Sequence, residues 1–467
     1  MSDTSTQPSR VESLVIGGGI AGLVAAKDLA LRGDKVTLIE STAHLGGLIS
    51  SVNLLGQSVD SGAEAFAVSR PNTLQLIESL GLGDKIVRPT RSDARIRIGG
   101  KNATIPSGVL GIPASLDDPT LLTSLSESAI RLAKFNDAQP WNLAGSPTIG
   151  EVVVNRLGSE FLERLVAPVI SGVHASDPMM LELRTVAPGL MEAATAAGSL
   201  VAGVAALRAK ASAPGAAVAG FEGGMHQLVA ELARNLASAE VEIRLNTEAS
   251  EVRVGPEAFE VVVKNSQPIT ARRLVIAVPP HAATVLLSKM PSVSNLLAKI
   301  KAVDVAVVAL AIQNPDLLNQ PLGSGVLIAE GDELIQAKAS THSSAKWSWL
   351  KSKFNAETEI IRLSYGRDGA IPVQFDDLID AAFNDVEALY GIQGSNLLDA
   401  KAVVWPKSLI QSVPGHAELV QQITAAVSEV PGLGLVGAGF GGNGITGIIA
   451  KTLETTSQIG VRYSHGE

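Results

Sequence analysis

The amino-acid sequence predicts an α/β protein: a Rossmann-like domain built from discontinuous segments, a mixed α+β domain and an inserted helical lobe. Two glycine turns predict the Rossmann-like domain. One lies in a strand–turn–helix–strand unit over residues 13–40, and the other follows a strand that begins at Leu433. Between them, residues 101–220 are mostly helical and rich in alanine and leucine, and strand patterns return over residues 241–280.

Length and composition exclude several classes of protein. A chain of 467 residues has room for about three domains of roughly 150 residues each. The net charge of −9 argues against binding to nucleic acid. Cysteine is absent, which excludes disulfides, thiolate metal sites and iron–sulfur clusters, and no histidine lies in a metal-spaced cluster, so no metal is expected. Redox chemistry would therefore need a bound organic cofactor.

Residues 13–40 have the pattern of a dinucleotide-binding βαβ unit. Gly17, Gly19 and Gly22 occupy the G-x-G-x-x-G positions, and Glu40 ends the second strand. Gly17 permits the tight turn, Gly19 lets the backbone approach a pyrophosphate, and Gly22 lets helix and strand pack closely. Glu40 is placed to accept the ribose hydroxyls and would repel a 2′-phosphate, which disfavours NADP. The unit predicts a dinucleotide site at the start of the first helix.

The second glycine turn predicts a further contact with the cofactor. Residues 433–437 are expected to form a strand, residues 438–446 a turn, and residues from Gly447 onward a helix. A helix N-terminus stabilises the negative charge that a flavin ring gains on reduction. The same pattern would also suit an ordinary βα unit that closes the sheet.

Two other stretches bear on location. Residues 1–10 are polar and lack the apolar run of a secretory signal, so we expect a flexible tail and a cytoplasmic protein. Residues 193–207 are uncharged but too few for a membrane span, which needs about 20 residues. A packed internal helix is expected there.

A series of segments resembles the protoporphyrinogen/coproporphyrinogen oxidases, which are oxygen-dependent FAD enzymes of the flavin amine oxidase superfamily. The bacterial coproporphyrin-forming members are the most similar in pattern. The segments are residues 17–47, with the pair Gly46-Gly47; 163–178, with Asp177-Pro178; 220–225, with Gly223-Gly224; 338–347, ending in Lys346-Trp347; 405–416, with Trp405-Pro406 and Gly415-His416; and 437–445, with Gly437-Ala438 and Gly444-Ile445. Because they span nearly the whole chain in the expected order, the resemblance is more specific than any single motif.

The sequence departs from the family pattern at a few positions. Leu48 stands where Arg or Lys is frequent, His174 where Tyr is usual, and Val404 where Arg is usual. Asn443 and Thr446 replace a frequent Val and Pro in the final turn. These departures are those of a divergent member.

The resemblance implies oxidation of a porphyrinogen to a porphyrin in haem biosynthesis. In each of three cycles, a hydride would pass from a saturated carbon of the macrocycle to flavin N5, a pyrrole N–H proton would leave, and dioxygen would reoxidise the flavin and form hydrogen peroxide. No catalytic residue is expected, because aromatisation drives the reaction and the flavin carries the chemistry.

The resemblance also implies site residues. Arg70, Lys346 and His174 are expected to contact the carboxylate-bearing substrate, and the basic stretch over residues 88–101 is a further candidate. The expected FAD contacts are Gly17, Gly19, Ile20, Ala21, Gly22, Glu40, Ser41, Gly46, Gly47, Leu48, Gly62, Ala63, Glu64, Val252, Trp405, Gly437, Gly444, Ile445 and Thr446.

The expected division of the chain follows. After the tail (1–10), the FAD-binding domain is formed by three segments, residues 11–88, 220–296 and 405–467. Residues 89–219 form a helical lobe with part of the substrate domain, and residues 297–404 form the substrate-binding domain.

Several alternatives remain open. The lack of a membrane segment and a positive pocket favour coproporphyrinogen III, with protoporphyrinogen IX as the alternative substrate. A flavin amine oxidase would need an aromatic cage, for which the final turn offers only Phe440. A carotene desaturase and a non-catalytic binding protein share the fold. The partners considered are a membrane, which the helical lobe would contact peripherally, and a ferrochelatase. The oligomeric state is open.

Overall fold

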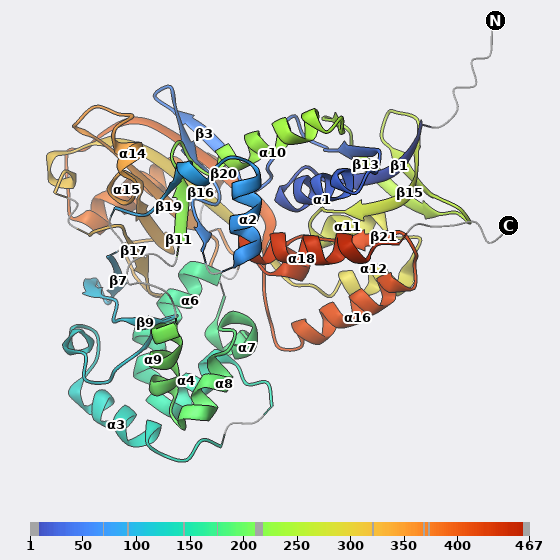
Figure 1. Cartoon of the computed structure of the whole chain (residues 1–467). Helices are drawn as coiled ribbons and strands as arrows, with labels where there is room; N and C mark the ends of the chain where they lie inside the picture. The colour runs from blue at the N-terminus through green and yellow to red at the C-terminus, as the bar shows by residue number, and fades with distance from the viewer. Residues whose placement is uncertain are drawn as a thin grey trace, which may run out of the picture.

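The computed structural model describes residues 9–460 except 69, 91–92, 143–144, 175, 211–217, 320–321, 368 and 372–373. Within these residues it is an α/β fold with two seven-stranded sheets and a separate group of helices (Figure 1). Residues 1–8 of the expected tail lie outside the described part, whereas Ser9 and Arg10 already belong to the first strand.

The first sheet is parallel at its centre. Its order is β12-β2-β1-β15-β14-β13, and β21 pairs with β15. The strands are β1 (Ser9–Ile16), β2 (Val36–Ile39), β12 (Glu242–Arg244), β13 (Ala249–Val254), β14 (Phe259–Val263), β15 (Ile269–Ile276) and β21 (Leu433–Leu435). Strands from the N-terminal, middle and C-terminal parts of the chain thus share one sheet.

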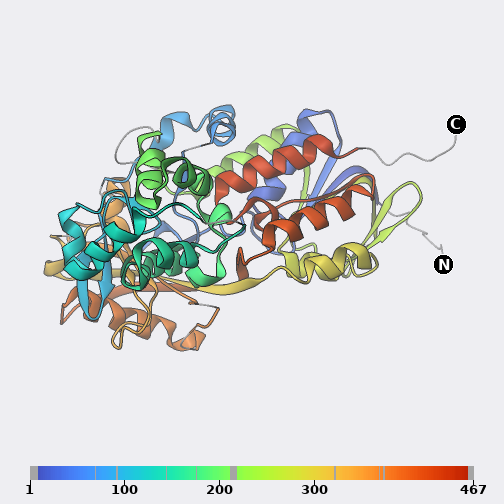
Figure 2. The ribbon, with the colours of Figure 1, turned by 90° about the horizontal axis from the view of Figure 1, so that it is seen from below.

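Helices cover both faces of this sheet because parallel strands are buried on both sides. One core contains side chains of α1 (Ile20–Leu31), α10 (His226–Ser238) and α18 (Ile445–Gln458). The other contains side chains of α11 (Pro280–Leu286), α12 (Pro291–Leu297) and α16 (His416–Ser428). Figures 1 and 2 show α18, from the end of the chain, beside α1, from its beginning.

The second sheet has the order β20-β16-β19-β18-β17-β7-β8. Its strands are β7 (Ala94–Ile98), β8 (Lys101–Thr104), β16 (Ala302–Gln313), β17 (Gly325–Ile328), β18 (Ala339–His342), β19 (Thr358–Tyr365) and β20 (Asn396–Ile410). Alternate residues of β16 point to opposite faces. Val308 and Leu310 pack in the core beneath α15 (Leu378–Tyr390), whereas Ala309 packs in a smaller core with Val59 of the β3–β4 hairpin (Ser51–Leu54 and Gln57–Asp60).

A further group of helices forms a lobe that projects away from both sheets at the bottom of Figure 1. They include α3 (Glu127–Asp137), α4 (Ile149–Leu157), α6 (Ala167–His174), α8 (Leu190–Ala197) and α9 (Leu200–Lys210), around a core of their own. The single helix expected over residues 193–207 is wrong. Gly198 adopts a φ of +68° and ends α8, and α9 leaves at 119° to it.

None of the described helices is by itself both long and apolar enough to cross a membrane, and only the bent pair of α8 and α9 reaches those limits jointly.

A buried ion pair organises the lobe. The Asp137 carboxylate accepts hydrogen bonds from Arg156 Nε (3.2 Å), Ser199 Oγ (2.6 Å) and the Leu200 backbone N–H (2.8 Å). Arg156 also donates to the carbonyl oxygens of Asp137 (2.6 Å) and Gln139 (2.9 Å). The pair therefore ties the end of α3 to α4 and to the first turn of α9.

Asp137→Ala should destabilise the protein by about 3–5 kcal/mol, because it leaves the buried Arg156 charge without its partner. The free energy of unfolding, measured by urea denaturation, checks this. Arg131→Ala removes one side of an exposed pair with Glu127 and should change that free energy by less than about 0.5 kcal/mol. Equal effects of the two substitutions would contradict the assigned role of Asp137.

Candidate functional site

The first glycine turn lies where the carboxyl ends of the parallel strands meet. Gly17 follows β1, has a φ of +108°, and donates its N–H to the Ile39 carbonyl (2.8 Å). A Cβ at Gly17 would lie 2.7 Å from the Ala277 carbonyl oxygen, and a Cβ at Gly22 would lie 1.8 Å from the Gly17 carbonyl oxygen. Only glycine fits these two positions, as the fingerprint predicts.

Gly19 differs from its neighbours because a Cβ there would meet no atom within 4 Å. It is the N-cap of α1, and no side chain caps that helix end. The first N–H groups of α1, at Ile20 and Ala21, therefore have no side-chain cap, and a Cβ at Gly19 would enter open space. An open cradle at an uncapped helix N-terminus suits the pyrophosphate of a dinucleotide.

Glu40 follows β2 and borders the same cradle. Its Oε2 accepts the Gly18 N–H (2.7 Å), and its Oε1 accepts the Thr42 N–H (2.9 Å) and the Ser41 hydroxyl (3.2 Å). An ionised carboxylate has about four acceptor positions, so capacity remains for a ribose hydroxyl. The residues present fit a dinucleotide.

The next expected contacts continue from this turn through backbone hydrogen bonds. The Gly46 N–H donates to the Gly18 carbonyl (2.8 Å), and the Ala63 N–H donates to the Leu48 carbonyl (2.9 Å). A Cβ at Gly62 would lie 2.0 Å from the Leu48 oxygen. The segments over residues 46–48 and 62–64 thus extend from the fingerprint as one strip of backbone.

The C-terminal turn reaches the same edge of the sheet. The Val436 N–H donates to the Ile276 carbonyl (3.0 Å), and Gly437 has a φ of +122°. The helix α18 begins at Ile445, earlier than the expected start at Gly447, and no side chain caps it at Gly444. Ile445 and Thr446 are buried.

Asn443 has a structural role that the sequence did not indicate. Its side-chain amide accepts the Ile410 N–H (2.9 Å) and donates to the Ile410 carbonyl (2.8 Å). It thereby ties the C-terminal turn to the end of β20. The residue was noticeable only as a departure from the family pattern.

Two expected FAD contacts lie further along the chain. Val252 is fully buried in β13, opposite Val261 of β14. Trp405 lies in β20, and its indole N–H points at the Ser61 carbonyl (3.4 Å). This contact brings the second sheet next to the segment over residues 61–64.

The three expected substrate contacts are not joined to one another by any hydrogen bond or ion pair in the described part of the chain. Arg70 is exposed at the N-cap of α2 (Pro71–Ser79), and its guanidinium has no partner among the described residues. Lys346, at the end of α13 (Ser343–Lys346), instead pairs with Glu64. Arg70 is thus the one of the three whose charge is available.

His174 ends α6, and its carbonyl accepts a hydrogen bond from Gln411 Nε2 (3.0 Å). Burial, together with the positive charge of Lys338, lowers the pKa of His174 to about 4. The imidazole is therefore neutral at neutral pH. It can donate or accept a hydrogen bond but brings no positive charge to a carboxylate.

Other cations also lie within the fold. Arg97, from the basic stretch over residues 88–101, is buried in a pair with Asp332 (2.8 Å), and Arg95 donates to Thr104 Oγ1 (2.6 Å). Arg367, which no sequence motif marks, donates to Ser171 Oγ of α6 and to the Ile328 carbonyl (2.9 Å). It follows β19 in a loop, where no periodicity marks it.

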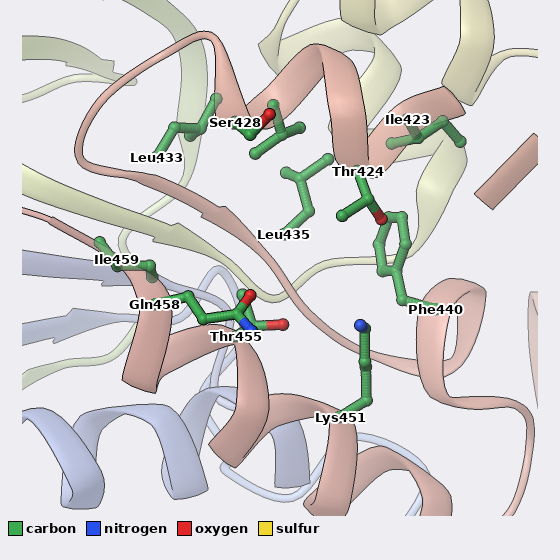
Figure 3. A pocket seen from close by; sticks show the side chains of 11 residues that line it. Ile423, Thr424, Ser428, Leu433, Leu435, Phe440, Lys451, Thr455, Gln458 and Ile459 are labelled. Carbon is green, nitrogen blue, oxygen red and sulfur yellow. The ribbon is translucent and has the colours of Figure 1, made fainter. Parts of the chain in front are cut away.

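Figure 3 shows a cavity of about 110 Å³ between α16, β21 and α18. Leu435, Ile459 and Phe440 line it, and Lys451 lies at its margin. Ligand sites are usually about 300–1,000 Å³, so this cavity is too small for a macrocycle. It is not part of the candidate site.

Comparisons with known proteins agree with this geometry. Residues 20–438 match the family described as flavin containing amine oxidoreductase. A coproporphyrinogen III oxidase of Mycobacterium leprae is 30% identical over 93% of this chain and 95% of its own length. A coproporphyrinogen III oxidase of Bacillus subtilis is 25% identical over 92% of this chain and 94% of its own length.

A solved structure from Exiguobacterium sp., provisionally described as a protoporphyrinogen oxidase, has a TM-score of 0.84 at 25% identity and covers 97% of this chain and 99% of its own. Cyclohexylamine oxidase from Brevibacterium oxydans has a TM-score of 0.69 at 18% identity, with 96% of this chain and 98% of its own covered, which shows the fold alone. The chain is therefore an FAD-dependent oxidoreductase and belongs to the flavin containing amine oxidoreductase family.

Proposed function

We propose that this protein oxidises coproporphyrinogen III to coproporphyrin III with FAD and dioxygen. The observation that carries the proposal is the similarity, over more than nine-tenths of the chain, to relatives from several bacteria that bear the name coproporphyrinogen III oxidase. Protoporphyrinogen IX is the second candidate substrate. It is supported by the similarity to the chloroplastic protoporphyrinogen oxidase 1 of Arabidopsis thaliana, at 23% identity over 94% of this chain and 84% of that protein.

In this proposal the protein positions the reactants. Bound FAD supplies the hydride acceptor, which dioxygen regenerates. The N-termini of α1 and α18 hold the phosphates and the ring, and Glu40 holds the ribose. Arg70 binds a propionate of the substrate, and the neutral His174 contributes a hydrogen bond without adding charge.

We assign the FAD-binding domain to residues 11–88, 220–296 and 405–467, the helical lobe with part of the substrate domain to residues 89–219, and the rest of the substrate domain to residues 297–404. The protein is proposed to act in the cytoplasm. The lobe, where Leu132 and Phe135 are 51% and 66% exposed, is the surface proposed for peripheral membrane contact. A ferrochelatase is the proposed recipient of the product.

Aerobic oxidation of the two porphyrinogens by the purified protein tests the substrate. Porphyrin fluorescence should rise faster with coproporphyrinogen III than with protoporphyrinogen IX. A faster reaction with protoporphyrinogen IX would reverse the assignment, and no fluorescence with either would remove porphyrinogen oxidation from this chain.

Gly19→Ala should weaken FAD binding by at least about tenfold while the stability of the apoprotein stays unchanged. The added methyl meets no protein atom within 4 Å, and the φ of −70° suits alanine, but the methyl occupies the space where the pyrophosphate would approach. Flavin titration of the apoprotein and its thermal midpoint give the two readouts. Gly22→Ala is the comparison, because it should destabilise the apoprotein itself. A Gly19→Ala protein with normal FAD affinity would argue against a pyrophosphate at this turn.

Arg70→Ala should raise KM about tenfold, leave kcat nearly unchanged and leave FAD bound, because it removes a charged contact made to the bound substrate. Steady-state kinetics on the preferred porphyrinogen measure this. Arg234→Ala removes an exposed arginine paired with the half-buried Glu231 and is a control for loss of surface charge. An unchanged KM for Arg70→Ala would reject the propionate role.

A further inference from the structure

A buried ion cluster joins the cofactor segment to the second sheet. The Glu64 carboxylate pairs with Lys346 Nζ and with Arg362 Nη1 (2.6 Å), and Arg362 Nη2 donates to the Gly62 carbonyl (2.7 Å). The side chains are 15%, 19% and 8% exposed for Glu64, Lys346 and Arg362. They come from the connection between β4 and β5 (Phe66–Ala67), from α13 and from β19.

The cluster carries a net positive charge because two cations share one acid. Neither cation pairs with a second acid in the described part of the chain, and Arg362 Nε is buried there without a partner. Burial alone would raise the pKa of Glu64, but Lys346 and Arg362 more than offset it and lower the pKa to about 2. The carboxylate is therefore ionised at neutral pH, so one anion faces two cations in this cluster.

The placement of the cluster follows from the backbone. Arg362 holds the Gly62 carbonyl, the adjacent Ala63 N–H bonds to Leu48, and Leu48 follows the Gly46-Gly47 pair that contacts the fingerprint turn. Gly220 lies against the cluster, where a Cβ would come within 3.1 Å of the Trp347 ring and 3.3 Å of the Glu64 carbonyl oxygen. The cluster is thus attached to the strip of backbone expected to lie along the flavin.

Buried ion clusters are weak evidence for stability, because desolvation of the charges offsets their attraction. A net charge beside a redox group changes the reduction potential of that group. A positive charge in a low-dielectric site raises it, because it favours the reduced form, which carries more electrons. The family resemblance places Lys346 at the substrate. In the structure, its charge is paired with Glu64 and is not directed toward a carboxylate of the substrate.

We propose that Glu64, Lys346 and Arg362 are positioning residues that fix the segment over residues 62–64 against FAD and raise the reduction potential of the flavin through their net positive charge. The inference rests on the FAD cofactor and on the expected placement of residues 62–64 beside the flavin. It does not depend on which porphyrinogen is oxidised.

The reduction potential of the bound flavin, measured by equilibration with a reference dye, tests the sign of this effect. Lys346→Met and Arg362→Met remove the excess charge and should each lower the equilibrium constant for flavin reduction about tenfold, which is about 30 mV for a two-electron couple. Glu64→Gln removes the acid and should raise that constant by a similar factor. Lys264→Met, at an exposed pair with Glu248, is the control and should leave the potential unchanged.

Opposite signs for the acid and the cations distinguish a charge effect from general disruption of the fold, which would move all three variants in one direction. Shifts of one sign, or potentials equal to that of the control, would overturn the proposal. If Glu64→Gln does not fold, the two cation variants still carry the test, because unchanged potentials in both would overturn the proposal.

Arg362→Lys separates charge from position. It keeps the charge, so the potential should stay within about twofold in the equilibrium constant, whereas FAD affinity should fall because the Gly62 carbonyl loses its fixed donor. A potential that falls as far as in Arg362→Met would contradict the charge effect. If the acid and cation variants shift the potential in opposite directions but neither porphyrinogen is oxidised, the proposed function fails and this inference stands. If a porphyrinogen is oxidised but the potentials do not shift in this way, only the inference is overturned.

Discussion

The close approach of α1 to the turn that precedes it is the constraint on which the site depends. A Cβ at Gly22 would lie 1.8 Å from the Gly17 carbonyl oxygen, so the helix can begin directly above the strand only because both residues are glycine. This contact directs the uncapped end of α1 toward the edge where Glu40 and the C-terminal turn also arrive. The other cofactor segments reach the same edge through the Gly18–Gly46 and Leu48–Ala63 backbone hydrogen bonds.

Much of the cofactor site could be predicted from the sequence because its parts are local. A strand, a glycine turn and an acidic strand end lie within residues 13–40, and each has one geometric reason to be there. The substrate side could not be predicted in the same way, because its residues meet through long-range packing. Nothing in the sequence near Lys346 indicates that Glu64 lies opposite it, and Arg367 reaches Ser171 from a loop without periodicity.

Two expectations based on local composition were wrong or incomplete because of contacts with distant parts of the chain. Residues 193–207 are a favourable helical sequence, yet Gly198 ends α8 in a left-handed conformation, and the start of α9 then bonds to the Asp137 carboxylate. Likewise, Arg97 belongs to a basic stretch that a surface strand would explain, but it is buried against Asp332. In both places the segment contacts a charged partner far away in the chain, which local sequence patterns do not reveal.

The sheet order also bears on how the chain acquires its cofactor. The strand β1 pairs with β15, β15 pairs with β21, and α18 packs on α1 only after the last part of the chain has been made. Pairings between such distant segments form late, because loop closure must precede them. A ribosome-bound chain would therefore expose the fingerprint turn long before the opposite wall of the site exists. The flavin site would therefore be complete only after α18 has been made and has packed on α1.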